Sequence, residues 1–288
     1  MRTSATTTRT WRSRVSAIAV EACALLVLIG CVAAVRSPDA HPPRRHDAAA
    51  VPAAATAVAE PPITATPAAS PAKAVAPRVS TATDAAAAGM VEIRSLVPDM
   101  SLEIRYAGRD NFVGRPVVGY EAAGCYLHRS AAQALARVER ALRPQGLRLH
   151  IFDCYRPVRA VQDFVRWAGD LGDQGTKSRY YPKLDKGVLL GDYISPTSGH
   201  SRGATLDLSL MELRGDRYAL LDMGTGFDYF DELAHTDSPH ASAAQRANRE
   251  RLRAAMRREG FENYPLEWWH YTFKPEPTPD TAFDFPVK

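Results

Sequence analysis

The sequence predicts an α+β fold, with a mainly antiparallel central sheet flanked by helices in a single domain. Helical spacing of apolar residues occurs in three segments, residues 129–142, 157–172 and 242–260. Extended patterns occur in three others, residues 147–153, 204–210 and 268–273. These segments do not follow a regular βαβ rhythm, which favours an antiparallel sheet over a parallel one.

The three helices follow from their apolar spacing and their end signals. "RSAAQALARVERAL" (129–142) places Ala132, Leu135, Val138 and Leu142 at helical intervals. The second segment begins with Pro157, which is favoured in the first turn of a helix. The third is charged and amphipathic, and Gly260 closes it as a C-cap.

The strands follow from alternation. "LRLHIFD" (147–153) and "ATLDLSL" (204–210) alternate with a period of two, the pattern of a half-buried strand. In the second strand this alternation places Thr205, Asp207 and Ser209 on one side. "WWHYTF" (268–273) is the third predicted strand.

Residues 1–36 are predicted to be an export signal and anchor region. Four arginines precede an apolar run over residues 15–35, which fits a signal sequence. "LIGC" (Leu28–Cys31) resembles a bacterial lipobox, in which the cysteine is lipidated and becomes the new N-terminus. The alternative is an uncleaved anchor, because about 20 apolar residues span a bilayer. Either interpretation places the rest of the chain outside the cytoplasm, on the periplasmic or cell-surface side.

Residues 37–89 are rich in alanine and proline and are predicted to be a disordered linker. The folded domain is therefore expected to span residues 90–288. Residues 1–90 carry nine basic and five acidic residues, which accounts for the whole net charge of +4. The other 27 basic and 27 acidic residues cancel. A neutral domain lacks the electrostatic footprint of a nucleic-acid partner.

Cys125 and Cys154 lie beyond the signal region. In an exported domain they either form a disulfide or remain two free buried thiols, and the sequence leaves both alternatives open.

His200 and Asp207 stand seven positions apart in a segment of small and apolar residues. A catalytic zinc takes three protein ligands from His, Asp and Glu, and His270 in "LEWWHY" can supply the third. Glu267 stands three residues before His270, where a carboxylate can accept a proton from an activated water. A packed core histidine and a hydrogen-bonded strand aspartate are the structural alternatives for these residues.

Five segments resemble one known family. "SGHSRGATLDL" (198–208) looks like the S-x-H-x-x-G-x-x-x-D motif of zinc D-alanyl-D-alanine dipeptidases of the VanX type, and "LEWWHY" (266–271) resembles their E-x-x-H motif. The other three segments are "LRLHIFDCYRPVRA" (147–160), "RYAGRDNFVGRPVVGY" (105–120) and "AFDFPVK" (282–288). The resemblance implies the fold that D,D-peptidases share with Hedgehog-like domains.

The resemblance also implies a set of site residues. The zinc ligands of the family fall on His200, Asp207 and His270, with one Zn²⁺ per chain. The general acid/base falls on Glu267, and the arginine that stabilises the transition state falls on Arg156. Groups near the free amino end of a small dipeptide substrate fall on three further residues, Tyr106, Ser198 and Asp228. Asp153 is expected to support Arg156.

The expected activity is zinc-dependent hydrolysis of D-alanyl-D-alanine. One alternative on the same scaffold is a D,D- or L,D-carboxypeptidase acting on peptidoglycan stem peptides. An alternative of another class is a catalytically silent peptidoglycan-binding module, although such a module has no need of Glu267 or Arg156. The sequence leaves open the oligomeric state, the native metal and the choice between glycopeptide resistance and D-alanine recycling.

Overall fold

The computed structural model describes residues 77–191 and 193–288. The predicted anchor region (1–36) and most of the predicted linker (37–89) lie outside these residues. The last part of that linker nevertheless belongs to the fold, because β1 (Arg78–Val79) pairs in parallel with β10 (Thr281–Ala282). The predicted boundary at residue 89 is therefore wrong: pairing with the C-terminal segment orders a stretch that has no apolar period of its own.

Four α-helices occur in the described residues: α1 (Arg129–Leu142), α2 (Val158–Gly169), α3 (Lys177–Tyr180) and α4 (Ala243–Arg258). The sequence predicted α1, α2 and α4, and α3 is too short to give a periodic signal. Ser242 and Gln245 form a capping box at the start of α4, and Gly260 follows its end with a φ of +89°. No helix in this part of the chain is long and apolar enough to cross a membrane.

The central sheet has the strand order β3-β5-β6-β9-β8, and β7 extends it by a hairpin with β6. Its members are β3 (Ser101–Leu102), β5 (Leu147–Asp153), β6 (Thr205–Arg214), β7 (Arg217–Leu220), β8 (Phe261–Asn263) and β9 (His270–Phe273). Every pair is antiparallel except β3 with β5, as predicted. A separate antiparallel pair joins β2 (Met90–Glu92) to β4 (Tyr126–His128).

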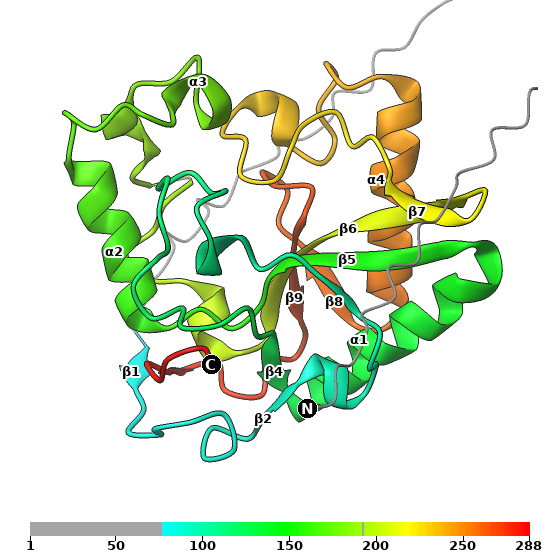
Figure 1. The fold of residues 1–288 in the computed structure, drawn as a ribbon, viewed down its shortest axis with the longest axis horizontal. Helices are drawn as coiled ribbons and strands as arrows, with labels where there is room; N and C mark the ends of the chain where they lie inside the picture. The colour runs from blue at the N-terminus through cyan, green and yellow to red at the C-terminus, as the bar shows by residue number, and fades with distance from the viewer. Residues whose placement is uncertain (1–76, 192) are drawn as a thin grey trace, which may run out of the picture. The chain divides into compact units, whose positions relative to one another are not determined.

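Strand β6 runs through the middle of the sheet, between β5 and β9 (Figure 1). Its residues 205–210 are all buried, so the prediction of a half-buried strand is wrong for β6. Leu206, Leu208 and Leu210 belong to the hydrophobic core. The polar residues on its opposite face are also buried, and one of them, Asp207, lines the pocket described below.

Helices α1 and α4 pack against each other and against the sheet, whereas α2 lies beside the segments that close the pocket (Figure 1). A contact between two aromatic rings connects α2 to the pocket. The ring of Phe164 on α2 lies 4.9 Å from the ring of Tyr106, measured between centroids. Helix α2 therefore supports one wall of the site.

Candidate active site

Three polar residues lie next to one another on three neighbouring strands of the sheet. Asp153 on β5 is opposite Asp207 on β6, and Asp207 is opposite His270 on β9. The register of β5 shifts between Ile151 and Asp153. Without this shift, alternation would place Asp153 on the core face that Ile151 occupies. The irregularity therefore turns Asp153 towards the site, a common use of a bulge next to an active site.

His200 lies on a short 3-10 helix, Gly199–Arg202, that leads directly into β6. The Oγ atom of Ser198 caps this helix by accepting a hydrogen bond from the backbone N–H of His200 at 3.2 Å. Gly203 ends the helix with a φ of +73°, and a Cβ atom there would overlap Met90. Glycine is therefore required at this turn, and the turn brings His200 beside Asp207.

His200, Asp207 and His270 converge with their ligand atoms all within 4.8 Å of one another. His200 Nε2 lies 3.4 Å from Asp207 Oδ2, His270 Nδ1 lies 3.1 Å from Asp207 Oδ1, and the two ring nitrogens lie 3.3 Å apart. Atoms bound to one tetrahedral zinc at about 2.0–2.1 Å are separated by about 3.3 Å, so the cluster has the dimensions of a zinc site. Asp207 Oδ1 is also buried without a hydrogen-bond partner, as expected of a metal ligand.

The ring of His200 is held in the tautomer that a metal requires. Its Nδ1 lies 2.7 Å from the carbonyl oxygen of Cys154, so Nδ1–H donates and Nε2 faces Asp207 with a free lone pair. Burial and the nearby charge of Arg156 lower the pKa of His200, which keeps the ring neutral. Burial alone would raise the pKa of Asp207, but its proximity to His200 and His270 holds it below its usual value.

Glu267 lies in the turn between β8 and β9, directly beside the cluster. Its Oε2 is 3.4 Å from His270 Nδ1, and Asn263 Nδ2 fixes the turn by donating to the Glu267 carbonyl at 3.0 Å. Burial, followed by the negative charge of Asp207, raises the pKa of Glu267 to about 8. A cation at the cluster favours the ionised form, so this carboxyl is placed to exchange protons near neutral pH.

Arg156 approaches the cluster from the other side. Its guanidinium donates to Asp153 Oδ2 at 2.9 Å and to Asp207 Oδ2 at 3.3 Å. It also lies 5.0 Å from the ring centroids of Tyr106 and Phe164. Tyr120 donates to the other oxygen of Asp153 at 2.6 Å, so Asp153 is fixed as well and the predicted support of Arg156 is present.

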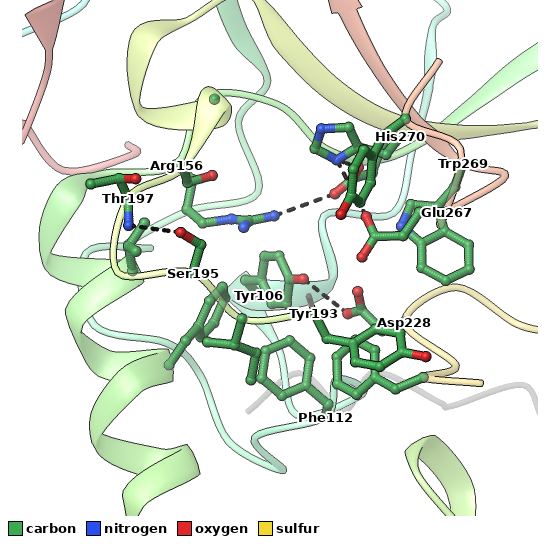
Figure 2. A pocket seen from close by; sticks show the side chains of 18 of the residues that line it. Tyr106, Phe112, Arg156, Tyr193, Ser195, Thr197, Asp228, Glu267, Trp269 and His270 are labelled. Atoms are coloured by element: carbon green, nitrogen blue, oxygen red, sulfur yellow. Dashed lines mark hydrogen bonds and ion pairs between the residues drawn. The ribbon is translucent and has the colours of Figure 1, made fainter. Parts of the chain in front are cut away.

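One cavity of about 380 Å³ lies between Arg156, Asp207, Glu267 and His270 (Figure 2). Seven of the eight predicted site residues line it: Tyr106, Arg156, Ser198, Asp207, Asp228, Glu267 and His270. The eighth, His200, is fully buried next to Asp207. The structure therefore brings the whole predicted set together.

Tyr106 and Asp228 line the pocket on the side away from His270 (Figure 2). The hydroxyl of Tyr106 donates to Asp228 Oδ2 at 2.9 Å. Asp228 is held at a φ of +59°, in the left-handed region that is uncommon outside glycine. Burial and the negative charge of Asp207 raise its pKa well above the usual range, so this carboxyl lacks a cationic partner strong enough to offset its desolvation.

Several aromatic residues of the pocket were not singled out from the sequence: Phe112, Phe164, Tyr193, Phe230, Tyr264 and Trp269. Trp269 also hydrogen-bonds the side chain of Glu267, which partly offsets the rise of its pKa. Phe112 and Trp269 had a sequence signal, because they lie inside "RYAGRDNFVGRPVVGY" and "LEWWHY". The others come from four separate segments that only the tertiary fold brings together.

The structure decides between the two alternatives for the cysteines. Cys125 and Cys154 form a disulfide with a Cα–Cα distance of 5.2 Å, within the usual range for such bonds. It ties the segment before β4 to the segment that follows β5.

An α+β domain in which two histidines, an aspartate, a half-buried glutamate and an arginine converge on one pocket has the arrangement of a metal-dependent hydrolase. A family model described as D-ala-D-ala dipeptidase matches residues 86–288. The chain belongs to this family of metallopeptidases.

Individual relatives agree with the family assignment. A D-alanyl-D-alanine dipeptidase of Streptomyces coelicolor is 41% identical over 196 residues, covering 68% of this chain and 96% of that protein. The dipeptidase of Enterococcus faecium is 39% identical over 201 residues, covering 69% of this chain and 98% of that protein. The dipeptidase of Escherichia coli is 34% identical over 182 residues, covering 63% of this chain and 83% of that protein.

Proposed function

We propose that this protein hydrolyses D-alanyl-D-alanine to two D-alanines, with one zinc ion held by His200, Asp207 and His270. The observation that carries the proposal is the convergence of these three residues, whose ligand atoms all lie within 4.8 Å of one another, with Glu267 and Arg156 in the same pocket. The dipeptidase names of the relatives support the substrate. A zinc ion at this cluster supplies Lewis acidity, because it polarises a carbonyl oxygen and lowers the pKa of water to about 7.

Glu267 is the proton carrier of this reaction. Its carboxylate lies beside the cluster and accepts a proton from the attacking water. The resulting acid then returns the proton to the departing amine, which would otherwise be a poor leaving group. A pKa raised towards neutrality suits both steps, because the same group acts first as a base and then as an acid.

Arg156 stabilises the negative charge that develops on the carbonyl oxygen. Asp153 holds its Nε, and the rings of Tyr106 and Phe164 flank its guanidinium, so the side chain is positioned before the substrate arrives. Burial opposes its charge, but the surrounding carboxylates raise its pKa well above the usual value. The group therefore stays protonated throughout the reaction.

Asp228 binds the free ammonium group of the dipeptide, and Tyr106 fixes this carboxyl by its hydroxyl hydrogen bond. An ammonium group supplies the cationic partner that Asp228 lacks, since an opposite charge favours the ionised carboxylate. Ser198 lies at the edge of the same pocket, and its Oγ already caps the helix of His200. It contributes to substrate binding from this position.

The test is amine release by the purified chain from D-Ala-D-Ala, with L-Ala-L-Ala and a stem pentapeptide ending in D-Ala-D-Ala as comparison substrates. Each assay is run on the untreated protein, after chelation and after zinc is returned. Zinc-dependent cleavage of the D,D-dipeptide alone is expected. Cleavage mainly of the pentapeptide would instead indicate a wall-trimming carboxypeptidase, and zinc binding without turnover would indicate a silent binding module.

We also propose that the enzyme acts outside the cytoplasm, on the periplasmic or cell-surface side, tethered to the membrane by lipid on Cys31. The Cys125–Cys154 disulfide supports export, since such bonds persist mainly in oxidising compartments. Labelling cells with a radioactive fatty acid tests this proposal. The wild-type chain is expected to carry label in the membrane fraction, and Cys31→Ser is expected to lose it. Equal labelling of the two would contradict the lipid anchor.

A further inference from the structure

The segment between β5 and α2 carries three groups of the site within four residues. Asp153 accepts from Arg156, the Cys154 carbonyl accepts from His200 Nδ1, and Arg156 reaches Asp207. This segment is irregular, because the ladder of β5 with β6 ends at Asp153 and α2 begins only at Val158. The geometry of the site therefore depends on a stretch of chain that neither a sheet nor a helix holds in place.

Few backbone hydrogen bonds hold this segment. The N–H of Tyr155 donates to the Tyr126 carbonyl at 3.0 Å, and the N–H of Arg156 donates to the His200 carbonyl at 3.3 Å. The hydroxyl of Tyr155 also donates to the Phe285 carbonyl at 2.9 Å. The bond from Cys154 to Cys125 adds a covalent constraint, and both cysteines are buried. The carbonyl of Cys125 itself accepts from the N–H of Ile93 at 3.0 Å, so the far end of the disulfide is also fixed.

We infer that the Cys125–Cys154 disulfide is a positioning element of the metal site, which holds the Cys154 carbonyl against the ring of His200. That carbonyl fixes the ring orientation and the tautomer that presents Nε2 to the metal. Because Arg156 follows two residues later, the same bond limits the movement of its guanidinium. The inference rests on the proposed function, since it assigns His200 as a metal ligand.

A disulfide that only stabilises the fold would act differently. The bond links residues separated by 29 positions and so restricts the unfolded chain, which raises the midpoint of thermal unfolding wherever the bond lies. Such a role leaves the metal affinity and the coordination geometry of the folded protein unchanged. The two roles therefore differ in the properties of the folded state.

The test compares the full-length wild type with the double variant Cys125→Ala/Cys154→Ala. The zinc Kd is measured by competition with a chromogenic chelator, and the visible absorption of the Co²⁺-substituted proteins reports the coordination geometry. We expect the zinc Kd to weaken about 10-fold, near the lower end of the effect of losing a partner of a metal ligand. We also expect an altered cobalt band, and a lower kcat with KM little changed.

Leu142→Ala is the matched control, because Leu142 is a buried residue of α1 that does not line the pocket. This variant is expected to lower the Tm of the metal-free protein while leaving the zinc Kd and the cobalt band as in the wild type. A cysteine variant that behaves like Leu142→Ala would overturn the inference. If the alanine pair does not fold, Cys125→Val/Cys154→Ala restores more of the buried volume for the same measurements.

Zinc binding is measured without substrate, so it separates this inference from the proposed function. A wild type that binds zinc more tightly than the cysteine variant but does not cleave D-Ala-D-Ala would contradict the proposed function alone. A wild type that binds no zinc would contradict both.

Discussion

The two faces of strand β6 are equally buried but have opposite chemistry. On one face Leu206, Leu208 and Leu210 are fully excluded from solvent and belong to the hydrophobic core. On the other face Thr205, Asp207 and Ser209 are at most 2% exposed. One strand therefore supports the core with one set of side chains and the active site with the other.

The comparison shows what makes a buried polar face tolerable. A buried charge is costly unless it is paired or bound to a metal, and Asp207 lies within 3.1–3.4 Å of His200, His270 and Arg156. The leucines need only apolar neighbours of complementary shape, so their contribution to stability depends on volume and packing. Substitution of Asp207 should therefore change chemistry, and substitutions on the leucine face should change stability.

The largest effect is expected from Asp207→Ala, which removes the central ligand of the cluster. The variant should retain no stoichiometric zinc after dialysis and should show no measurable turnover, as checked by atomic absorption and amine release. Ser209→Ala is the matched control, because Ser209 is buried on the same face two positions along and does not line the pocket. Stoichiometric zinc in Asp207→Ala would contradict the ligand assignment.

Glu267→Gln should lower kcat by about 10²–10⁴-fold, the usual contribution of a general acid/base. Zinc should stay bound, because Glu267 acts on protons next to the cluster and is not one of its ligands. The measurement is kcat together with the metal content of the same sample. A variant that loses both zinc and activity would move Glu267 into the ligand set.

Arg156→Ala should lower kcat by about 10²–10³-fold, the typical cost of removing one oxyanion donor. Zinc content should stay close to one per chain. Arg156→Lys keeps the positive charge but loses the planar fork that contacts Asp153 and Asp207, so it should recover only part of the rate. A near-normal rate in the alanine variant would exclude Arg156 from the reaction.

Local sequence signals predicted most of this arrangement. Helical spacing defined α1, α2 and α4, and the seven-residue spacing of His200 and Asp207 indicated two members of the cluster. The match to five family segments supplied the role of Arg156, which spacing alone could not assign, and agreed with the role that spacing had indicated for Glu267. These features depend on residues that lie close together in the chain or that form a fixed pattern.

Features that depend on long-range geometry could not be predicted in the same way. Strict alternation in β5 would place Asp153 on the core face, and only the register shift after Ile151 turns it towards Arg156. The alternation in β6 indicated a half-buried strand, because nothing in the sequence shows that the rest of the fold also covers its polar face. The cysteine pairing was likewise left open until the fold placed the two Cα atoms 5.2 Å apart.

Leu208→Ala tests the opposite face of β6. Deleting most of a fully buried leucine side chain should lower the free energy of unfolding by about 2–5 kcal/mol, as measured by urea denaturation. Below its unfolding transition, the variant should keep zinc and a kcat within about two-fold of the wild type, since Leu208 belongs to the hydrophobic core and does not line the pocket. Loss of zinc from the folded variant would show that the two faces are coupled.

Thr205→Val is expected to have the smallest effect, and it tests how far the active site extends along the polar face of β6. Thr205 lies on the polar face, but its Oγ1 bonds to Thr272 Oγ1 at 2.9 Å and does not line the pocket. Valine keeps the shape and removes the hydroxyl, so unfolding should become easier by about 1 kcal/mol with kcat unchanged. Thr272→Val and the double variant complete a double-mutant cycle, which isolates the energy of this one hydrogen bond. A large loss of kcat in Thr205→Val would extend the active site along β6, whereas a pure stability change would place its boundary between Thr205 and Asp207.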